Sequence, residues 1–109
     1  MGLNVGELGR DMLVAAKGSL VDSWPDIKDF TEVEVKKLAQ GIVAIEKMYL
    51  QEKIDKKTAK LLLNIHKNAM QTVLLTVEGM GIIAVEKAIN AALKVAKEGV
   101  NAALGFALI

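Results

Sequence analysis

Polar residues in the second half of the chain recur every three or four positions, and there are few of them. Between residues 56 and 77 they include Lys57, Lys60, Asn64, Lys67 and Gln71, and beyond residue 81 they include Lys87, Asn90, Lys94, Lys97 and Asn101. On an α-helix this spacing forms one narrow polar stripe and leaves most of the circumference apolar. A helix of this kind is usually surrounded by packing partners. The pattern therefore predicts helices that must bury more than one face.

The apolar residues of the chain are of the kind that favours helices over sheets. Of the 109 residues 52% are hydrophobic, yet only Trp24, Phe30, Tyr49 and Phe106 are aromatic, and there is a single proline. Leu, Ile, Met and Ala dominate in helices, whereas aromatic residues are enriched in strands. We therefore expect one all-α domain over residues 1–109, an oligomeric bundle of about four helices. Residues 1–30 would form an N-terminal helix and a Trp-Pro connector, and residues 31–109 a core of helical hairpins.

The N-terminal part predicts a helix followed by a connector. Asn4 is a helix cap with Glu7 three residues on, as in a capping box, and the helix should reach Val21. Its buried face is predicted from residues spaced by three and four: Val5, Leu8, Met12, Ala15 and Ser19. Pro25 interrupts the pattern, so residues 22–30 are expected to be a connector, with Trp24, Ile27 and Phe30 folding back as a lid.

Three further helices follow the connector. Thr31 and Glu34 form a capping box for a helix that should end near Ile54. Its buried seam is predicted to consist of Val35, Leu38, Ile42, Ile45 and Tyr49. Asp55 is a cap for a helix from Lys56 to about Glu78, and a last helix should run from Gly81 to near Ile109. Gly79-Met80-Gly81 could be a turn or a weak point of one long helix, and we favour a turn.

The last helix carries an unusual row of small residues. Ala84, Ala88, Ala92 and Ala96 are spaced by four, and Gly99, Ala103 and Ala107 continue the row. Such rows let two helix backbones approach closely. The final nine residues carry no charged side chain, and they could pack on the chain itself, a second copy, a partner or lipid. We assign a self-association interface to Ala84, Ala88, Ala92, Ala96, Gly99, Ala103, Phe106 and Ile109.

Charge gives little sign of a polyanionic partner. The chain has 14 Lys plus Arg against 13 Asp plus Glu, a formal charge of +1, which argues against nucleic acid as a partner. The strongest asymmetry is in residues 56–77, which contain Lys56, Lys57, Lys60 and Lys67 and no acidic residue. These lysines are predicted to be a solvated helix face, with contact to an anionic surface as the alternative.

No motif for catalysis, metal or cofactor binding is present in the sequence. There is no cysteine, and the single histidine, His66, has no carboxylate three or four residues away. The paired acidic residues Glu32 and Glu34 fit a first helical turn, and Asp22, Asp26 and Asp29 match no calcium loop. The sequence therefore predicts a protein that is not an enzyme and has no cofactor and no metal.

These features predict a structural protein. The first hypothesis is a small helical subunit or scaffold that associates with itself, or with a partner helical protein, through coiled-coil-like helix packing. The alternative is a membrane-associated or membrane-active helical protein, for example a component of a viral or secretion assembly. Without a basic, apolar leader or an apolar stretch of about 20 residues, the expected location is the cytoplasm or a larger particle.

Overall fold

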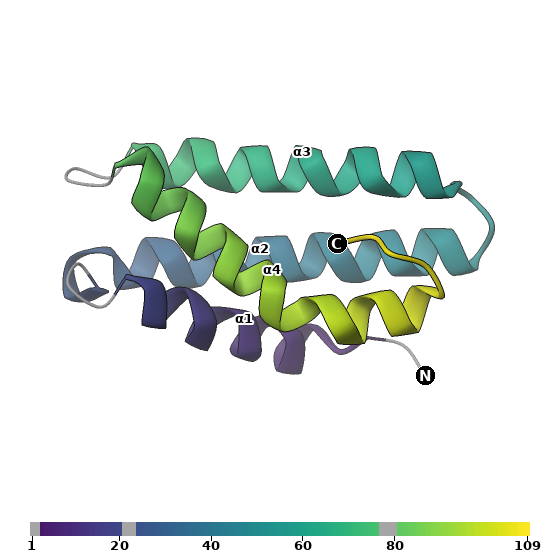
Figure 1. The fold of residues 1–109 in the computed structure, drawn as a ribbon, viewed down its shortest axis with the longest axis horizontal. Helices are drawn as coiled ribbons and strands as arrows, with labels where there is room; N and C mark the ends of the chain where they lie inside the picture. The colour runs from purple at the N-terminus through teal and green to yellow at the C-terminus, as the bar shows by residue number, and fades with distance from the viewer. Residues whose placement is uncertain (1–2, 21–23, 77–80) are drawn as a thin grey trace.

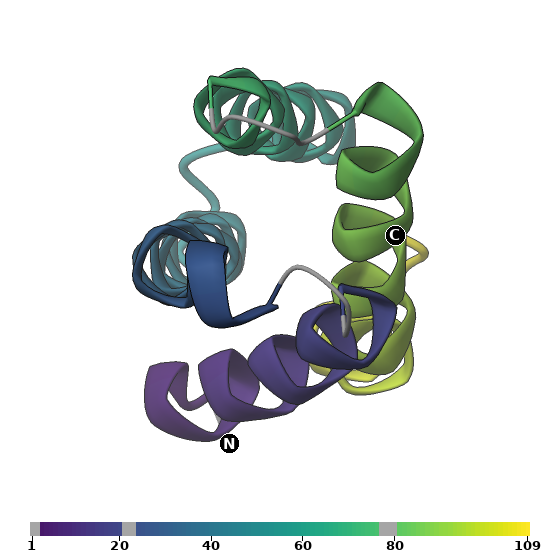
Figure 2. The same cartoon turned by 90° about the vertical axis from the view of Figure 1, so that its left-hand side faces the viewer.

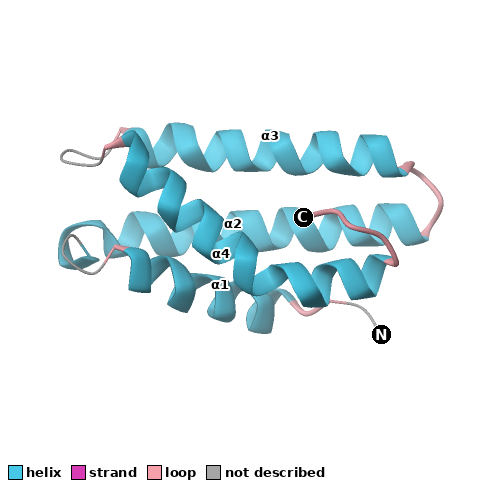
Figure 3. Cartoon of the chain, viewed as in Figure 1, coloured by secondary structure: helices cyan, strands magenta, loops and turns pink. Residues whose placement is uncertain are grey.

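Four helices packed side by side form the chain. The computed structural model describes residues 3–20, 24–76 and 81–109, and these contain α1 (Val5–Ser19), α2 (Trp24–Leu50), α3 (Lys56–Leu75) and α4 (Ile82–Leu104), with no strand. α2 and α3 form an antiparallel hairpin, α1 lies on the far side of α2 from α3, and α4 crosses the open side of the hairpin (Figures 1 and 2). Figure 3 shows helices joined by short loops throughout the described residues. The all-α helical bundle is confirmed.

α1 begins at the predicted cap. The side chain of Asn4 accepts a hydrogen bond from the backbone N–H of Glu7 at 3.1 Å. The buried residues are Leu8, Met12, Ala16 and Leu20, whereas Ser19 is exposed and Ala15 is half-buried. The prediction that Ala15 and Ser19 are buried was wrong, because the buried residues of α1 are spaced by four throughout. A row of residues at this spacing is inclined to the helix axis and packs against neighbouring helices. The predicted end at Val21 lies outside the described residues.

α2 begins seven residues earlier than predicted. Trp24 and Pro25 form its first turn, so most of the expected connector is helical and the capping box at Thr31 is wrong. Proline is tolerated in a first turn because the backbone N–H groups there have no partner within the helix. The side chains of Trp24, Ile27 and Phe30, and hence the predicted lid, lie outside the described part of the chain. The helix ends at Leu50 and not Ile54, and Glu52 in the following turn has a φ of 59°.

Thr31 and Glu34, the expected capping box, are buried residues inside α2. Thr31 is fully buried, and its hydroxyl has no hydrogen-bond partner among the described residues. The buried carboxylate of Glu34 lies 3.2 Å from the ammonium of Lys37, which is largely exposed. Farther along α2, the buried carboxylate of Glu46 accepts the N–H of Leu3 at 3.0 and 3.1 Å and so ties the start of the chain to this helix.

Asp55 is the predicted cap of α3. Its Oδ1 accepts a hydrogen bond from the backbone N–H of Thr58 at 2.7 Å, and this bond lowers the pKa of the carboxyl group. α3 ends at Leu75, three residues before the predicted end, and α4 begins at Ile82 with Gly81 at its cap position. The predicted break between the two helices is therefore confirmed, although Gly79 and Met80 lie outside the described residues.

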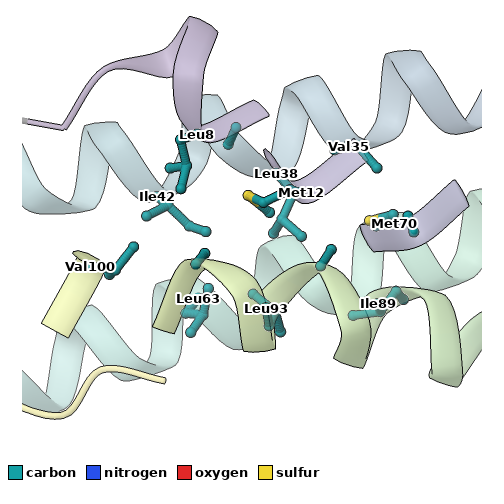
Figure 4. Close-up of a cluster of buried hydrophobic side chains, with 14 of the residues drawn as sticks. Leu8, Met12, Val35, Leu38, Ile42, Leu63, Met70, Ile89, Leu93 and Val100 are labelled. Carbon is teal, nitrogen blue, oxygen red and sulfur yellow. The ribbon is translucent and has the colours of Figure 1, made fainter. Parts of the chain in front are cut away.

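The core contains side chains from all four helices. Figure 4 shows Leu8 and Met12 of α1, Leu38 and Ile42 of α2, Leu63 of α3 and Leu93 of α4 directed into one cluster. Of the predicted seam of α2, Val35, Leu38, Ile42 and Ile45 are buried, and Tyr49 is half-buried. Among the described residues, α4 supplies the most buried hydrophobic side chains: Val85, Ala88, Ile89, Ala92, Leu93, Ala96, Val100 and Leu104.

Gly41 of α2 lies against the imidazole ring of His66 on α3. A Cβ built on Gly41 would be 2.8 Å from three atoms of that ring, which is closer than side chains can approach. Gly41→Ala is therefore expected to lower the free energy of unfolding by about 1–3 kcal/mol. Gly99→Ala is the matched control, because a Cβ there meets nothing within 4 Å and should add about 0.5–1 kcal/mol. Urea unfolding measures both changes.

A second background isolates the Gly41 contact. In His66→Ala the ring is absent, so Gly41→Ala should then stabilise the helix as Gly99→Ala does. An increase in stability from Gly41→Ala in the unmodified chain would show that the ring moves away without cost.

Candidate interaction surface

The predicted interface residues of α4 are mostly enclosed by the chain itself. Ala88, Ala92 and Ala96 are buried in the core, and Ala84 is half-buried. α4 packs most extensively against α1, so the small side chains of this row face the chain's own helices. A second copy cannot reach Ala88 or Ala92, which are fully buried, while the chain holds this fold. Gly99, by contrast, is exposed.

The C-terminal tail folds back onto its own chain. α4 ends at Leu104 and not near Ile109 as predicted, because its C-cap residue Gly105 has the left-handed φ of 80° that is common after a helix. The Asn101 Oδ1 accepts the N–H groups of Leu108 and Ile109 at 2.9 and 3.1 Å, and its Nδ2 donates to the carbonyl of Ile109. Leu108 is buried, and Ile109 and Ala103 are half-buried. The apolar tail could have packed on its own chain, a second copy, a partner or lipid, and in the structure it packs on its own chain.

Phe106 completes that contact. Its ring lies 4.8 Å from the ring of Tyr49 at the end of α2, and the ammonium of Lys56 lies 5.6 Å from its centroid. Lys56 therefore has a neighbour within the chain, and an aromatic face is a favourable one for a cation. Of the eight predicted interface residues, Phe106 and Ile109 thus have intramolecular neighbours that the sequence could not identify.

The outer face of α3 is a surface that the prediction did not select. Leu61 and Ile65 are 59% and 54% exposed, and Leu75 at the other end of the helix is also exposed. Together with Asn68 and Thr72 they are spaced by four and three, so they lie along one line, opposite the buried Ala59, Leu63, Met70 and Leu74. We name Leu61, Ile65, Asn68, Thr72 and Leu75 the α3 outer face.

Hydroxyl groups at the end of α3 are already satisfied within the helix. The Thr72 Oγ1 donates to the carbonyl of Asn68 at 2.9 Å, and the Thr76 Oγ1 donates to the carbonyl of Val73. Such bonds satisfy the threonine hydroxyls within the helix. The α3 outer face therefore carries no charge and only one amide side chain that needs a new partner.

The four lysines predicted as an anionic contact do not share one patch. Lys57 and Lys60 are exposed on the first half of α3, close to Leu61. Lys67 is half-buried and lines a hollow shared with Glu86 and Asn90 of α4, and Lys56 lies over Phe106. Of the four lysines, only Lys57 and Lys60 therefore combine exposure with proximity to the α3 outer face.

Residues considered for chemistry are dispersed. His66 is half-buried against Gly41, Glu34 is paired with Lys37, and Asp29 is exposed. Asp22 and the side chain of Asp26 lie outside the described residues. In the described ranges no three His, Asp or Glu side chains come together as metal ligands would. Within the same ranges, no helix has the length and apolarity needed to span a bilayer.

Comparison of the chain with protein-family models, curated proteins and solved structures finds no match.

Proposed function

We propose that the protein is a non-enzymatic structural subunit that associates with itself through helix packing. The observation that supports this function is the α3 outer face, an uncharged line on which Leu61, Ile65 and Leu75 are exposed and which no other described helix covers. Single exposed apolar residues are ordinary on protein surfaces, whereas contiguous ones indicate an interaction site. The α3 outer face replaces the alanine row of α4 as the proposed contact.

Other exposed apolar side chains at one end of the bundle add to the α3 outer face. Ile82 and Ile83 in the first turn of α4 are also exposed, at the same end of the bundle as Leu75 (Figure 1). Full burial of a Leu or Ile side chain is worth about 1.5–3 kcal/mol. The exposed apolar side chains of this surface are then Leu61, Ile65, Leu75, Ile82 and Ile83. Covering their exposed parts would gain about 4–8 kcal/mol for each copy, which is comparable with the cost of association of about 4–15 kcal/mol.

The test is the mass of the protein in solution. Light scattering after size exclusion should give a multiple of the 11.7 kDa chain mass, and Leu61→Gln with Ile65→Gln should return the protein to the monomer. Leu50→Gln with Val33→Gln is the control, because those side chains are equally exposed but lie on α2. A chain that stays monomeric up to high concentration would refute the proposal.

Binding to an anionic membrane surface is the second candidate function. Lys57 and Lys60 flank the apolar α3 outer face, which is the arrangement of a helix that lies in the plane of a bilayer. Co-sedimentation with vesicles containing phosphatidylserine, at low salt, should then exceed that with phosphatidylcholine alone. Equal or absent binding to both would remove this candidate.

A further inference from the structure

A groove between α1 and α4 combines an apolar floor with acidic walls. It has a volume of about 220 Å³, and it is lined by Leu3, Asn4, Glu7, Leu8, Asp11, Val95, Ala96, Gly99 and Val100. Leu8, Ala96 and Val100 are buried and form its floor, while Glu7, Asp11 and Val95 are exposed at its edges. We name these residues the α1/α4 groove. Its lining contains two carboxylates and no basic side chain.

The α1/α4 groove and the α3 outer face lie on different sides of the molecule. Two perpendicular views place α3 at the top and α1, with the C-terminal half of α4, at the bottom (Figures 1 and 2). The two surfaces also differ in charge. Lys57 and Lys60 flank the α3 outer face, and the described α3 has no acidic residue within its bounds.

We infer that the α3 outer face of one copy of the chain docks in the α1/α4 groove of a second copy. This inference depends on the proposed self-association and specifies its two surfaces. The carboxylates of Glu7 and Asp11 provide the counter-charges that Lys57 and Lys60 need, whereas the described α3 of a second copy provides none. Complementary charges of this kind select the partner surface and its orientation.

The shapes of the two surfaces are also compatible. Gly99 has no side chain and has nothing within 4 Å of the Cβ position, so the α4 wall is open at the middle of the groove. From Leu61 to Leu75 the α3 outer face is about 21 Å long at 1.5 Å per residue, close to the length of the 15-residue α1. A helix can therefore lie along α1 with Leu61 and Ile65 over Val95 and the buried floor.

Contact between two different surfaces has a consequence for the assembly. A copy that is bound through its α3 outer face still has a free α1/α4 groove. A copy that is bound through its groove still has a free α3 outer face. Such a heterologous contact forms a ring where the rotation closes and an open filament where it does not. Because the two surfaces lie on different sides of the molecule (Figures 1 and 2), two copies cannot make the contact reciprocally, so a closed two-fold dimer is not expected.

A charge exchange between the surfaces tests the inference. One variant carries Lys57→Glu with Lys60→Glu, and the other carries Glu7→Lys with Asp11→Lys. Each alone would place like charges together, so its assembly measured by sedimentation velocity should weaken at least about tenfold. An equimolar mixture should assemble again, because each acidic α3 then meets a basic groove and each basic α3 meets an acidic one. Lys36→Glu with Lys47→Glu is the control of equal charge change on α2.

Gly99→Leu provides a second test without a change of charge. The new side chain enters open space, so the chain should remain folded while the groove is filled and assembly weakens. Urea unfolding of each variant confirms the fold before assembly is compared. If the groove variants assemble like the unmodified chain while Leu61→Gln with Ile65→Gln does not, the α1/α4 groove is excluded and self-association through α3 stands. A monomeric unmodified chain overturns both proposals.

Discussion

Replacement of Ile42 by alanine is expected to lower the free energy of unfolding by about 2–5 kcal/mol. Ile42 is fully buried at the middle of α2, where side chains of α1, α3 and α4 surround it (Figure 4). The substitution removes three carbon atoms, so the favourable free energy of transferring them from water to the core is lost. It also leaves a cavity that the close-packed neighbours fill only in part. Urea or thermal unfolding monitored by circular dichroism measures the loss.

Ile65→Ala on α3 is the matched control for this change. The same three carbon atoms are removed, but the side chain is 54% exposed and its helix position favours alanine. A monomeric sample should therefore change by less than about 0.5 kcal/mol. If the two substitutions have equal effects, Ile42 is not at the centre of the core.

Replacement of Ala92 by leucine should destabilise the chain by about 1–3 kcal/mol or more. Ala92 is fully buried on the face of α4 that packs within the bundle, so the larger side chain has no space without a shift of the backbone or of neighbouring side chains. Ala102→Leu is the control, because Ala102 is exposed on the same helix and leucine is a good helix former. Unfolding in urea should separate the two variants clearly.

The buried position of Ala92 changes how the result of Ala92→Leu must be interpreted. From the alanine row one expects this substitution to disrupt an assembly by overpacking the close helix contact. Because Ala92 lies in the core of a single chain, loss of assembly in this variant would follow from loss of the fold. Only substitutions at exposed positions such as Leu61 and Gly99 can report on association.

Local signals in the sequence predicted the helix caps well. Asn4 and Asp55 each bind a backbone N–H three residues ahead, and this bond depends on few other parts of the chain. The capping box of Thr31 and Glu34 had the same local signal but lies inside α2. A helix that starts at Trp24, with Pro25 in its first turn, is equally compatible with the local sequence. The buried sites of Thr31 and Glu34 are created by the packed bundle.

Small residues predicted a close helix neighbour but could not identify it. The row at Ala88, Ala92 and Ala96 has the same form whether a helix of another copy or of the same chain packs on it. The structure fills it from within the bundle, where α1 is the principal neighbour of α4, about 80 residues away in the chain. The apolar excess of residues 56–77 predicted a helix that buries more than one face, whereas Leu61 and Ile65 of α3 are exposed in the structure.

The contact between His66 and Gly41 provides a spectroscopic reporter that requires no label. The imidazole ring lies where a side chain on Gly41 would begin, so it faces the α-protons of that glycine. Ring currents displace the NMR resonances of protons in such a position. Because His66 is the only histidine in the chain and belongs to α3, the displaced Gly41 signal follows the closure of the α2–α3 hairpin separately from the remainder of the bundle.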